Sequence, residues 1–90
     1  MRSFEFDTRK SISNKRKHGI DFEEAKALWD DPELLIIDAR SEDEPRSRLV
    51  AKLGVVYWPA FFTKRGDTIR IISVRKARRE ERNEYENSEG

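Results

Sequence analysis

The pattern of apolar and polar positions divides the chain into a helical N-terminal third and a strand-rich remainder. Between residues 20 and 30, Phe22, Ala25 and Leu28 recur at helical spacing and would share one buried face. From residue 33 onward the pattern changes to alternating or continuous apolar runs, which are typical of strands. Four strands are therefore predicted, over residues 34–38, 46–53, 55–63 and 68–74.

The first predicted helix is short and polar. It runs from Asp7 to about Lys17, because Asp7 or Thr8 can accept hydrogen bonds from the first free backbone N–H groups. Gly19 follows at the position where a helix commonly ends in the left-handed conformation. These two signals bound the helix on both sides.

The second predicted helix spans about Phe22 to Asp30. Asp21 and Glu24 have the spacing of a capping box, in which each side chain bonds the backbone N–H of the other. Asp31-Pro32 ends the helix, because proline disfavours the helical conformation in the residue before it. A third helix is predicted from Ala77 to Tyr85, with few apolar side chains to pack on a core.

Short connections between the strands determine the expected fold. The links near Gly54 and at residues 64–67 are too short for a crossover, so the strands they join should be antiparallel. Pro59 cannot donate a ladder hydrogen bond, which predicts an edge, a bulge or an early strand end at that position. The predicted fold class is α+β: a small antiparallel four-stranded sheet packed by two N-terminal helices, with a C-terminal helix, in a single domain over residues 1–90.

Charge is distributed unevenly along these elements, although the net charge is only +1. Residues 46–82 carry eleven lysines and arginines against three acids, whereas residues 21–45 carry ten acids against two bases. A basic block of this kind is the electrostatic signature of nucleic-acid binding, unless folding scatters its residues over opposite faces. The charged N-terminus lacks the apolar core of a signal peptide, and no apolar run has the length of a membrane span. We therefore expect a cytoplasmic protein without a membrane partner.

The residue inventory favours one type of chemistry. With one histidine and no cysteine, and with acids mostly in runs, the chain predicts neither a metal site nor a cofactor. A glycine-rich phosphate loop is also absent from the sequence. Bases and cations remain, and they suit metal-free RNA cleavage, in which the 2′-hydroxyl of the substrate is the nucleophile. The protein then only positions the RNA, transfers protons and neutralises the charge that builds on phosphorus.

Ten residues are candidates for this chemistry. His18, Arg75 and Tyr85 are the predicted catalytic residues. Arg75 is expected closest to the scissile phosphate, because it lies where the most buried predicted strand meets the last helix, so its backbone is held while its side chain can reach the sheet surface. His18 has an equally good structural interpretation, since a histidine in the last helical turn often bonds free carbonyl groups. The predicted RNA-binding residues are Lys17, Arg46, Arg48, Lys64, Arg65, Arg70 and Lys76. The aromatic residues that could stack bases, or pack in the core, are Trp58, Phe61 and Phe62.

Several short motifs together resemble a known family. They are FEFD at residues 4–7, KHGI at 17–20, RIIS-x-RKA at 70–77 and ER-x-x-YE at 81–86. In this combination and spacing the chain resembles the BrnT toxins of type II toxin–antitoxin modules. The resemblance implies a RelE-like fold and an RNA-cleaving toxin that stops growth by attacking messages. It also implies a BrnA-like antitoxin of the ribbon-helix-helix class, which covers the toxin and binds operator DNA in the complex.

Two alternatives of other classes remain open at this stage. A non-catalytic nucleic-acid-binding or antitoxin-like module would use the same basic surface without a proton-transfer group. A structural adaptor that only holds a protein partner would show neither RNA cleavage nor salt-sensitive RNA binding.

Overall fold

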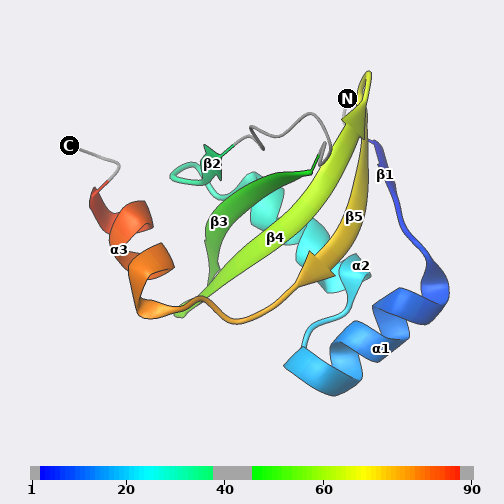
Figure 1. Cartoon of the computed structure of the whole chain (residues 1–90), viewed down its shortest axis with the longest axis horizontal. Helices are drawn as coiled ribbons and strands as arrows, with labels where there is room; N and C mark the ends of the chain where they lie inside the picture. The colour runs from blue at the N-terminus through cyan, green and yellow to red at the C-terminus, as the bar shows by residue number, and fades with distance from the viewer. Residues whose placement is uncertain (1–2, 38–45, 88–90) are drawn as a thin grey trace.

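The structure, a computed structural model, describes residues 3–37 and 46–87 (Figure 1). These residues form a five-stranded sheet with the strand order β1-β5-β4-β3-β2, flanked by helices. The elements in chain order are β1 (Ser3–Glu5), α1 (Thr8–His18), α2 (Phe22–Ala25), the 3₁₀ helix η1 (Lys26–Asp30), β2 (Leu35–Ile37), β3 (Ser47–Leu53), β4 (Val56–Arg65), β5 (Thr68–Val74) and α3 (Arg79–Asn87). The predicted α+β class is confirmed.

The predicted four-stranded antiparallel sheet is wrong in strand number and in one orientation. The additional strand β1 lies at an edge and pairs in parallel with β5, with Phe4 opposite Ile69. Its three residues are too few to show a strand period in the sequence. The four predicted strands are present as β2 to β5, and successive strands pair antiparallel as a meander. Residue 38, the last of the first predicted strand, lies outside the described residues.

Local capping explains where α1 begins and ends. The Asp7 side chain accepts hydrogen bonds from the backbone N–H groups of Arg9 and Lys10, at 2.8 and 3.1 Å. Gly19 adopts the left-handed conformation, with φ of 86°, and its N–H bonds the carbonyl of Lys15. Both predicted signals are confirmed, and α1 ends one residue later than predicted.

The second predicted helix has the expected start but a different second half. Asp21 and Glu24 form the capping box, with hydrogen bonds of 2.7 and 3.0 Å. Regular α-helix ends at Ala25, and Lys26–Asp30 continues as a 3₁₀ helix, so the prediction of one α-helix to Asp30 is wrong. Tightening into a 3₁₀ turn is common where a helix ends. Here the chain leaves the helix at Asp31, which is extended before Pro32.

The hydrophobic core lies on the face of the sheet that α2 and η1 cover (Figure 1). Trp29 of η1 packs edge-on against Phe4 and Phe62, with ring centroids 5.2 and 5.3 Å apart. Trp58 and Phe62 are both buried in this core, which removes them from the candidates for base stacking. Because side chains alternate along a strand, Phe61 points to the opposite face and is only half-buried.

Pro59 lies in the middle of the sheet, so the expectation of an edge position or an early strand end is wrong. It stands opposite Val50 of β3, and β4 continues to Arg65. On its other side β5 has already ended at Val74, and the N–H of Arg75 bonds the Pro59 carbonyl at 3.2 Å. The irregularity in the β4–β5 ladder occurs nearby, between Phe61 and Phe62. Proline is therefore tolerated where its neighbour strand stops.

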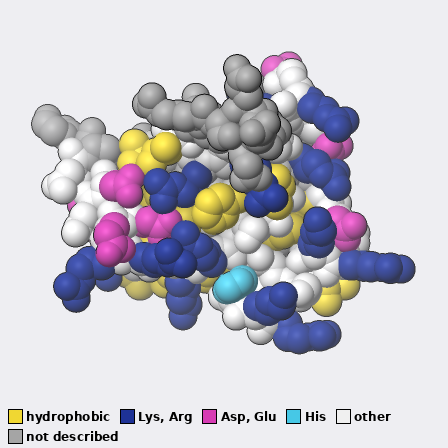
Figure 2. Space-filling model, viewed as in Figure 1, with side chains coloured by type: hydrophobic (Ala, Val, Ile, Leu, Met, Phe, Trp, Pro, Cys, Tyr) yellow, Lys and Arg dark blue, Asp and Glu magenta, His cyan; other side chains and the backbone are white. Residues whose placement is uncertain are grey.

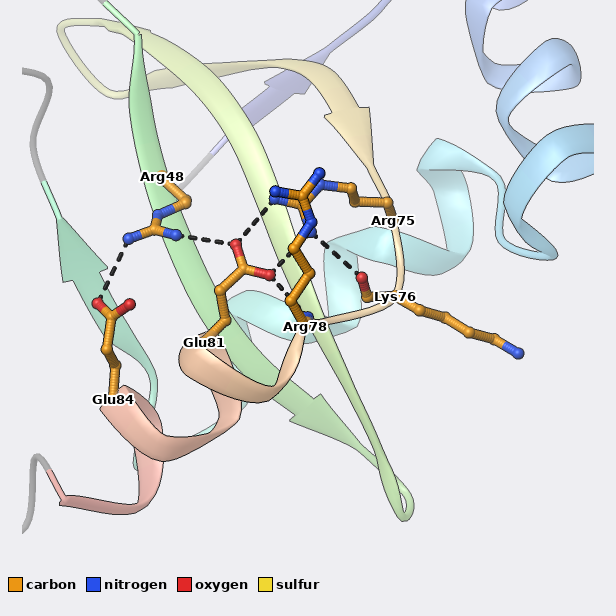
Figure 3. A network of polar contacts seen from close by, with 6 residues as sticks. All are labelled: Arg48, Arg75, Lys76, Arg78, Glu81 and Glu84. Carbon is orange, nitrogen blue, oxygen red and sulfur yellow. Dashed lines mark hydrogen bonds and ion pairs between the residues drawn. The ribbon is translucent and has the colours of Figure 1, made fainter.

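The C-terminal helix α3 lies two residues further along the chain than predicted, and it packs on the side of the sheet opposite α2 (Figures 1 and 3). Its buried residues are Glu81 and Tyr85, which share one helix face at i, i+4 spacing. Tyr85 packs on Tyr57 of β4, with ring centroids 5.3 Å apart. The helix thus docks through one carboxylate and one aromatic ring.

Candidate nucleic-acid interface

Between α1 and α3, no helix of the described residues crosses the face of the sheet that lies opposite α2 (Figure 1). We call this region the open face. Arg48 of β3 stands opposite Phe61 of β4, and Phe61 stands opposite Ser73 of β5, so all three belong to it. Figure 2 shows cationic side chains spread across this view, with the single histidine near its lower edge. Strand pairing and the contacts of Glu81 bring Arg48, Arg70 and Arg75 of the basic block to this side.

A buried carboxylate organises the arginines of the open face (Figure 3). Glu81 accepts two hydrogen bonds from the Arg75 guanidinium, at 2.8 and 2.9 Å, and one from Arg48 at 2.8 Å. Only 5% of its side chain is exposed. Arg48 also contacts Glu84 at 3.4 Å. One carboxylate thus orients two guanidinium groups that are far apart in the sequence.

Glu81 also caps α3. It is the third residue of the helix, and its carboxylate accepts the backbone N–H of Arg78 at 2.8 Å, as the glutamate of a capping box does. Burial by itself raises the pKa of Glu81, but hydrogen bonds from Arg75, the Arg78 backbone and Arg48, with the charge of Arg75, lower that pKa to about 2. The carboxylate is therefore ionised at neutral pH.

Arg75 keeps hydrogen-bonding capacity in this arrangement. A guanidinium has five N–H donors, and Arg75 uses three of them on Glu81 and the Lys76 carbonyl. Two donors are then unused within the described residues. The guanidinium lies 5.4 Å from the centre of the Phe61 ring, a cation–π contact that further restricts it. The group is held in place and can still bond an incoming phosphate.

Arg48, Arg75 and Glu81 together form what we call the arginine centre, and the other predicted RNA-binding arginines lie around it. Arg70 is exposed on the open face, and its guanidinium is 3.5 Å from the Glu5 carboxylate of β1. Arg65 is exposed at the end of β4, on the same face as Thr63, which stands opposite Arg70. Arg46 is exposed and immediately precedes β3.

The predicted lysines are distributed more widely. Lys76 is exposed and follows Arg75 directly. Lys64 is the neighbour of Arg65 in β4 and stands opposite Ile69 of β5. Because neighbouring side chains of a strand point to opposite faces, Lys64 lies on the core side of the sheet, away from the open face. The structure therefore separates Lys64 from the other predicted RNA-binding residues.

Lys17 and His18 line a pocket between α1 and β5 with a volume of about 180 Å³. His18 is half-buried and is the last residue of α1, so both its catalytic and its capping interpretations remain compatible with its position. Ser73 lines the same pocket, two residues before Arg75. The pocket thus brings the histidine into the neighbourhood of the arginine centre.

Tyr85 is held away from solvent. Its hydroxyl donates a 2.8 Å hydrogen bond to the Asp31 carboxylate, and the residue is 8% exposed. Burial, together with the hydrogen bond to Asp31 and the charge of Asp31, raises the pKa of Tyr85 to about 12. Its catalytic role stays a prediction, which requires the hydroxyl to leave Asp31.

Two residues of this region had no assigned role in the sequence prediction. Glu81 lies inside the predicted helix, but its capping position is recognisable only once α3 is known to begin at Arg79, two residues later than predicted. Asn14 is buried, and its amide donates to the carbonyls of Ile20 and Val74 and accepts from the Val74 N–H, at 2.8, 2.9 and 3.2 Å. No local pattern indicates that contact, because its partner on β5 is 60 residues away.

Within residues 3–37 and 46–87, no three His, Asp or Glu side chains come close enough together to hold a metal ion. None of the helices in these ranges is long and apolar enough to cross a membrane.

The fold and the open face define a class: a small α+β protein that presents organised arginines on an accessible sheet surface, as nucleic-acid-binding proteins do. The family model described as "Ribonuclease toxin, BrnT, of type II toxin-antitoxin system" matches residues 6–81 of the 90. The chain therefore belongs to the BrnT family of ribonuclease toxins. No curated protein sequence matches it. The family resemblance predicted from the short motifs is confirmed.

Proposed function

We propose that this protein is the endoribonuclease toxin of a type II toxin–antitoxin module and cleaves RNA without a metal ion. Membership of a ribonuclease toxin family supports RNA as the substrate. The proposed consequence in the cell is the loss of messages, which inhibits translation and growth. The RelE-like assignment of the fold belongs to the same proposal.

The observation that carries this proposal is the pair Arg48 and Arg75, oriented by the buried carboxylate of Glu81. Negative charge builds on the phosphorus oxygens when RNA is cleaved, and donors held in place before the reaction stabilise that charge most effectively. Arginine suits this role because it is always protonated and its fork bonds two phosphate oxygens. In this arrangement Glu81 is a positioning residue, and Arg75 contacts the scissile phosphate.

The proposed reaction is an internal transfer of the phosphate. The 2′-oxygen attacks the adjacent phosphorus and loses its proton to a base, while the bond from phosphorus to the 5′-oxygen breaks and that oxygen takes up a proton. The products are a 2′,3′-cyclic phosphate and a 5′-hydroxyl. His18 is the first candidate for proton transfer, because an imidazole can accept a proton at one ring nitrogen and donate one from the other.

Tyr85 is the second candidate for proton transfer, and the variant Tyr85→Phe tests it. A catalytic phenol predicts loss of cleavage with retained RNA affinity. If the variant folds and cleaves at the parental rate, Tyr85 only anchors α3 through Asp31.

Flanking nucleotides are proposed to contact the remaining cations of the open face through salt-sensitive phosphate interactions. Arg65 and Arg70 lie along β4 and β5 on one side of the arginine centre, and Lys17 lies beside His18 at the α1 pocket. Arg46 and Lys76 are exposed near the ends of β3 and β5. Lys64, on the other side of the sheet, contributes only to the overall positive field.

The proposed protein partner is a BrnA-like antitoxin of the ribbon-helix-helix class. It neutralises the toxin in the cytoplasm, and the complex binds operator DNA through the antitoxin. Support comes from the family, whose members are toxins of type II modules. Co-expression with the neighbouring reading frame, followed by co-purification and an operator-binding assay, tests this part of the proposal.

The decisive experiment for the enzyme is single-turnover cleavage of an end-labelled single-stranded RNA in excess chelator. We expect cleavage to persist and to leave cyclic phosphate and 5′-hydroxyl ends. Activity that disappears in chelator and returns with a divalent ion would exclude the metal-free mechanism. Tight, salt-sensitive binding without cleavage would instead favour a non-catalytic nucleic-acid-binding module.

A further inference from the structure

The pocket between α1 and β5 has an unusual composition for its position. Residues of α1 at helical spacing form one wall, and the bulged end of β5 forms the other. The lining residues are Lys10, Ser13, Asn14, Lys17, His18, Phe22, Ile72 and Ser73. Cationic and hydroxyl groups face this space, and no carboxylate lines it.

Several cations on neighbouring surfaces already have an acidic partner. Lys15, on another side of α1, bonds Glu24 at 2.7 Å. On the open face, Arg70 pairs with Glu5, Arg75 with Glu81, and Arg48 with both Glu81 and Glu84. Lys10 and Lys17 make no ion pair with any described residue. Two ammonium groups over a polar pocket produce a local positive potential that an anion would satisfy.

A β-bulge shapes the second wall of the pocket. The β4–β5 register passes from Phe61 opposite Ser73 to Phe62 opposite Ile71, which leaves Ile72 as an extra residue in β5. Successive residues of a regular strand point to opposite faces, whereas Ile72 and Ser73 both line the pocket. Bulges re-aim side chains in this way and are frequent next to functional sites. The bulge thus lets both Ile72 and Ser73 face the pocket beside α1.

Asn14 also lines the pocket, but its amide does not compete for a ligand. The Asn14 amide is fully engaged with Ile20 and with both backbone groups of Val74. The hydroxyls of Ser13 and Ser73, in contrast, make no hydrogen bond within the described residues, and both side chains are half-buried. Two lysines and two hydroxyls are therefore available to one tetrahedral anion.

We propose that this pocket binds one backbone phosphate of the RNA, next to the phosphate that Arg75 contacts. Lys10 and Lys17 supply the charge, and Ser13 and Ser73 donate hydrogen bonds. Ser73 is two residues from Arg75, so an RNA strand that crosses the open face can reach the pocket and Arg75 with successive phosphates. This inference rests on the proposed function, because it gives the same RNA substrate a second, separate point of attachment.

The binding test compares two double variants with equal charge change on the same helix. Lys10→Gln/Lys17→Gln removes the pocket cations, and Arg9→Gln/Arg16→Gln removes two exposed cations that do not line the pocket. The probe is a single-stranded RNA with 2′-O-methyl groups throughout, which cannot be cleaved by 2′-attack. We expect the pocket variant to bind roughly tenfold more weakly or worse, and to flatten the slope of log K against log salt by about 1.4, or 0.7 for each lost contact.

A second measurement locates the anion directly. Inorganic phosphate is titrated into the ¹⁵N-labelled protein, with sodium chloride at matched ionic strength as the control, and backbone amide shifts are followed. Phosphate should shift the signals of Ser13 and Ser73 in the parent but not in the Lys10→Gln/Lys17→Gln variant. Equal losses of RNA affinity in the two double variants, or equal shifts with phosphate and chloride, would overturn the proposal.

These outcomes are separable from failure of the enzyme proposal, because the binding probe cannot be cleaved. If the parent binds through the pocket but does not cut unmodified RNA, the proposed ribonuclease activity fails and the anion site stands. If the parent cleaves, and the pocket variant binds and cuts like the Arg9→Gln/Arg16→Gln control, the pocket proposal fails and the activity stands.

Discussion

Arg75 and Glu81 are joined by two parallel hydrogen bonds of 2.8 and 2.9 Å, and this pair connects the end of β5 to the first turn of α3. The same carboxylate reaches Arg48 on β3 and the backbone of Arg78. The candidate phosphate-binding centre and the docking of the C-terminal helix therefore depend on one buried group. Changes at either residue should affect both activity and stability, in proportions that distinguish the two roles.

Arg75→Ala should lower the single-turnover cleavage rate by about 10²-fold to 10³-fold, the cost of losing one preorganised donor, with little loss of RNA affinity. Arg75→Lys keeps the charge but loses the fork, so it should remain impaired. Arg65→Ala is the control, since it should mainly weaken binding and its salt dependence. Circular dichroism checks that the Arg75→Ala variant folds. If it folds and cleaves RNA at the parental rate, this arginine is only part of a solvated rim.

Glu81 should make stability depend on pH in the acidic range. Its pKa is lowered from 4.5 to about 2 in the folded protein, so its contribution is fully present above pH 4.5 and is lost as the pH falls toward 2. A shift of this size corresponds to a stabilisation on the order of 3 kcal/mol. Urea unfolding of the parent and of Glu81→Gln at several pH values measures it. The difference between the two proteins should shrink as the pH drops, and a constant difference would contradict the assigned pKa.

Asn14→Ala should destabilise the fold by roughly 2–4 kcal/mol, because it leaves the buried N–H and carbonyl of Val74 without partners. Ile12→Ala is a matched control on the same helix, since Ile12 is 56% exposed, and it should change the free energy of unfolding by no more than about 0.5 kcal/mol. Denaturant titration of both variants gives the comparison. Similar losses in the two variants would mean that the Asn14 bridge does not hold α1 on β5.

A cognate antitoxin should raise the melting temperature of this chain markedly. A small domain buries little surface, and α3 docks through few residues, so the free protein should be only marginally stable. A partner present at 100 times its dissociation constant adds about 2.7 kcal/mol, which corresponds to at least about 10 °C for a domain of this size. Thermal unfolding with the cognate and with a non-cognate antitoxin tests this. An already hyperstable chain that gains nothing from its partner would count against the toxin proposal.

Local sequence was sufficient for several elements because their signals act over a few residues. The Asp7 cap, the left-handed Gly19 and the capping box of Asp21 and Glu24 are contacts between near neighbours in the chain. Four of the five strands followed from apolar patterning in the same way. The motifs that indicated the family are likewise short, and the family model confirms them.

Long-range pairing decided the rest. β1 exists because Ser3–Glu5 finds β5 more than 60 residues away, where parallel pairing and the contact of Phe4 with Trp29 compensate for its short length. The sequence predicted Arg48 and Arg75 as candidate cations. That both bond Glu81 depends on how α3 docks over β3. Tyr85 is the clearest case, since its hydroxyl meets Asp31 across 54 residues. Such contacts form only when the sheet brings distant segments together, so no local pattern could have shown them.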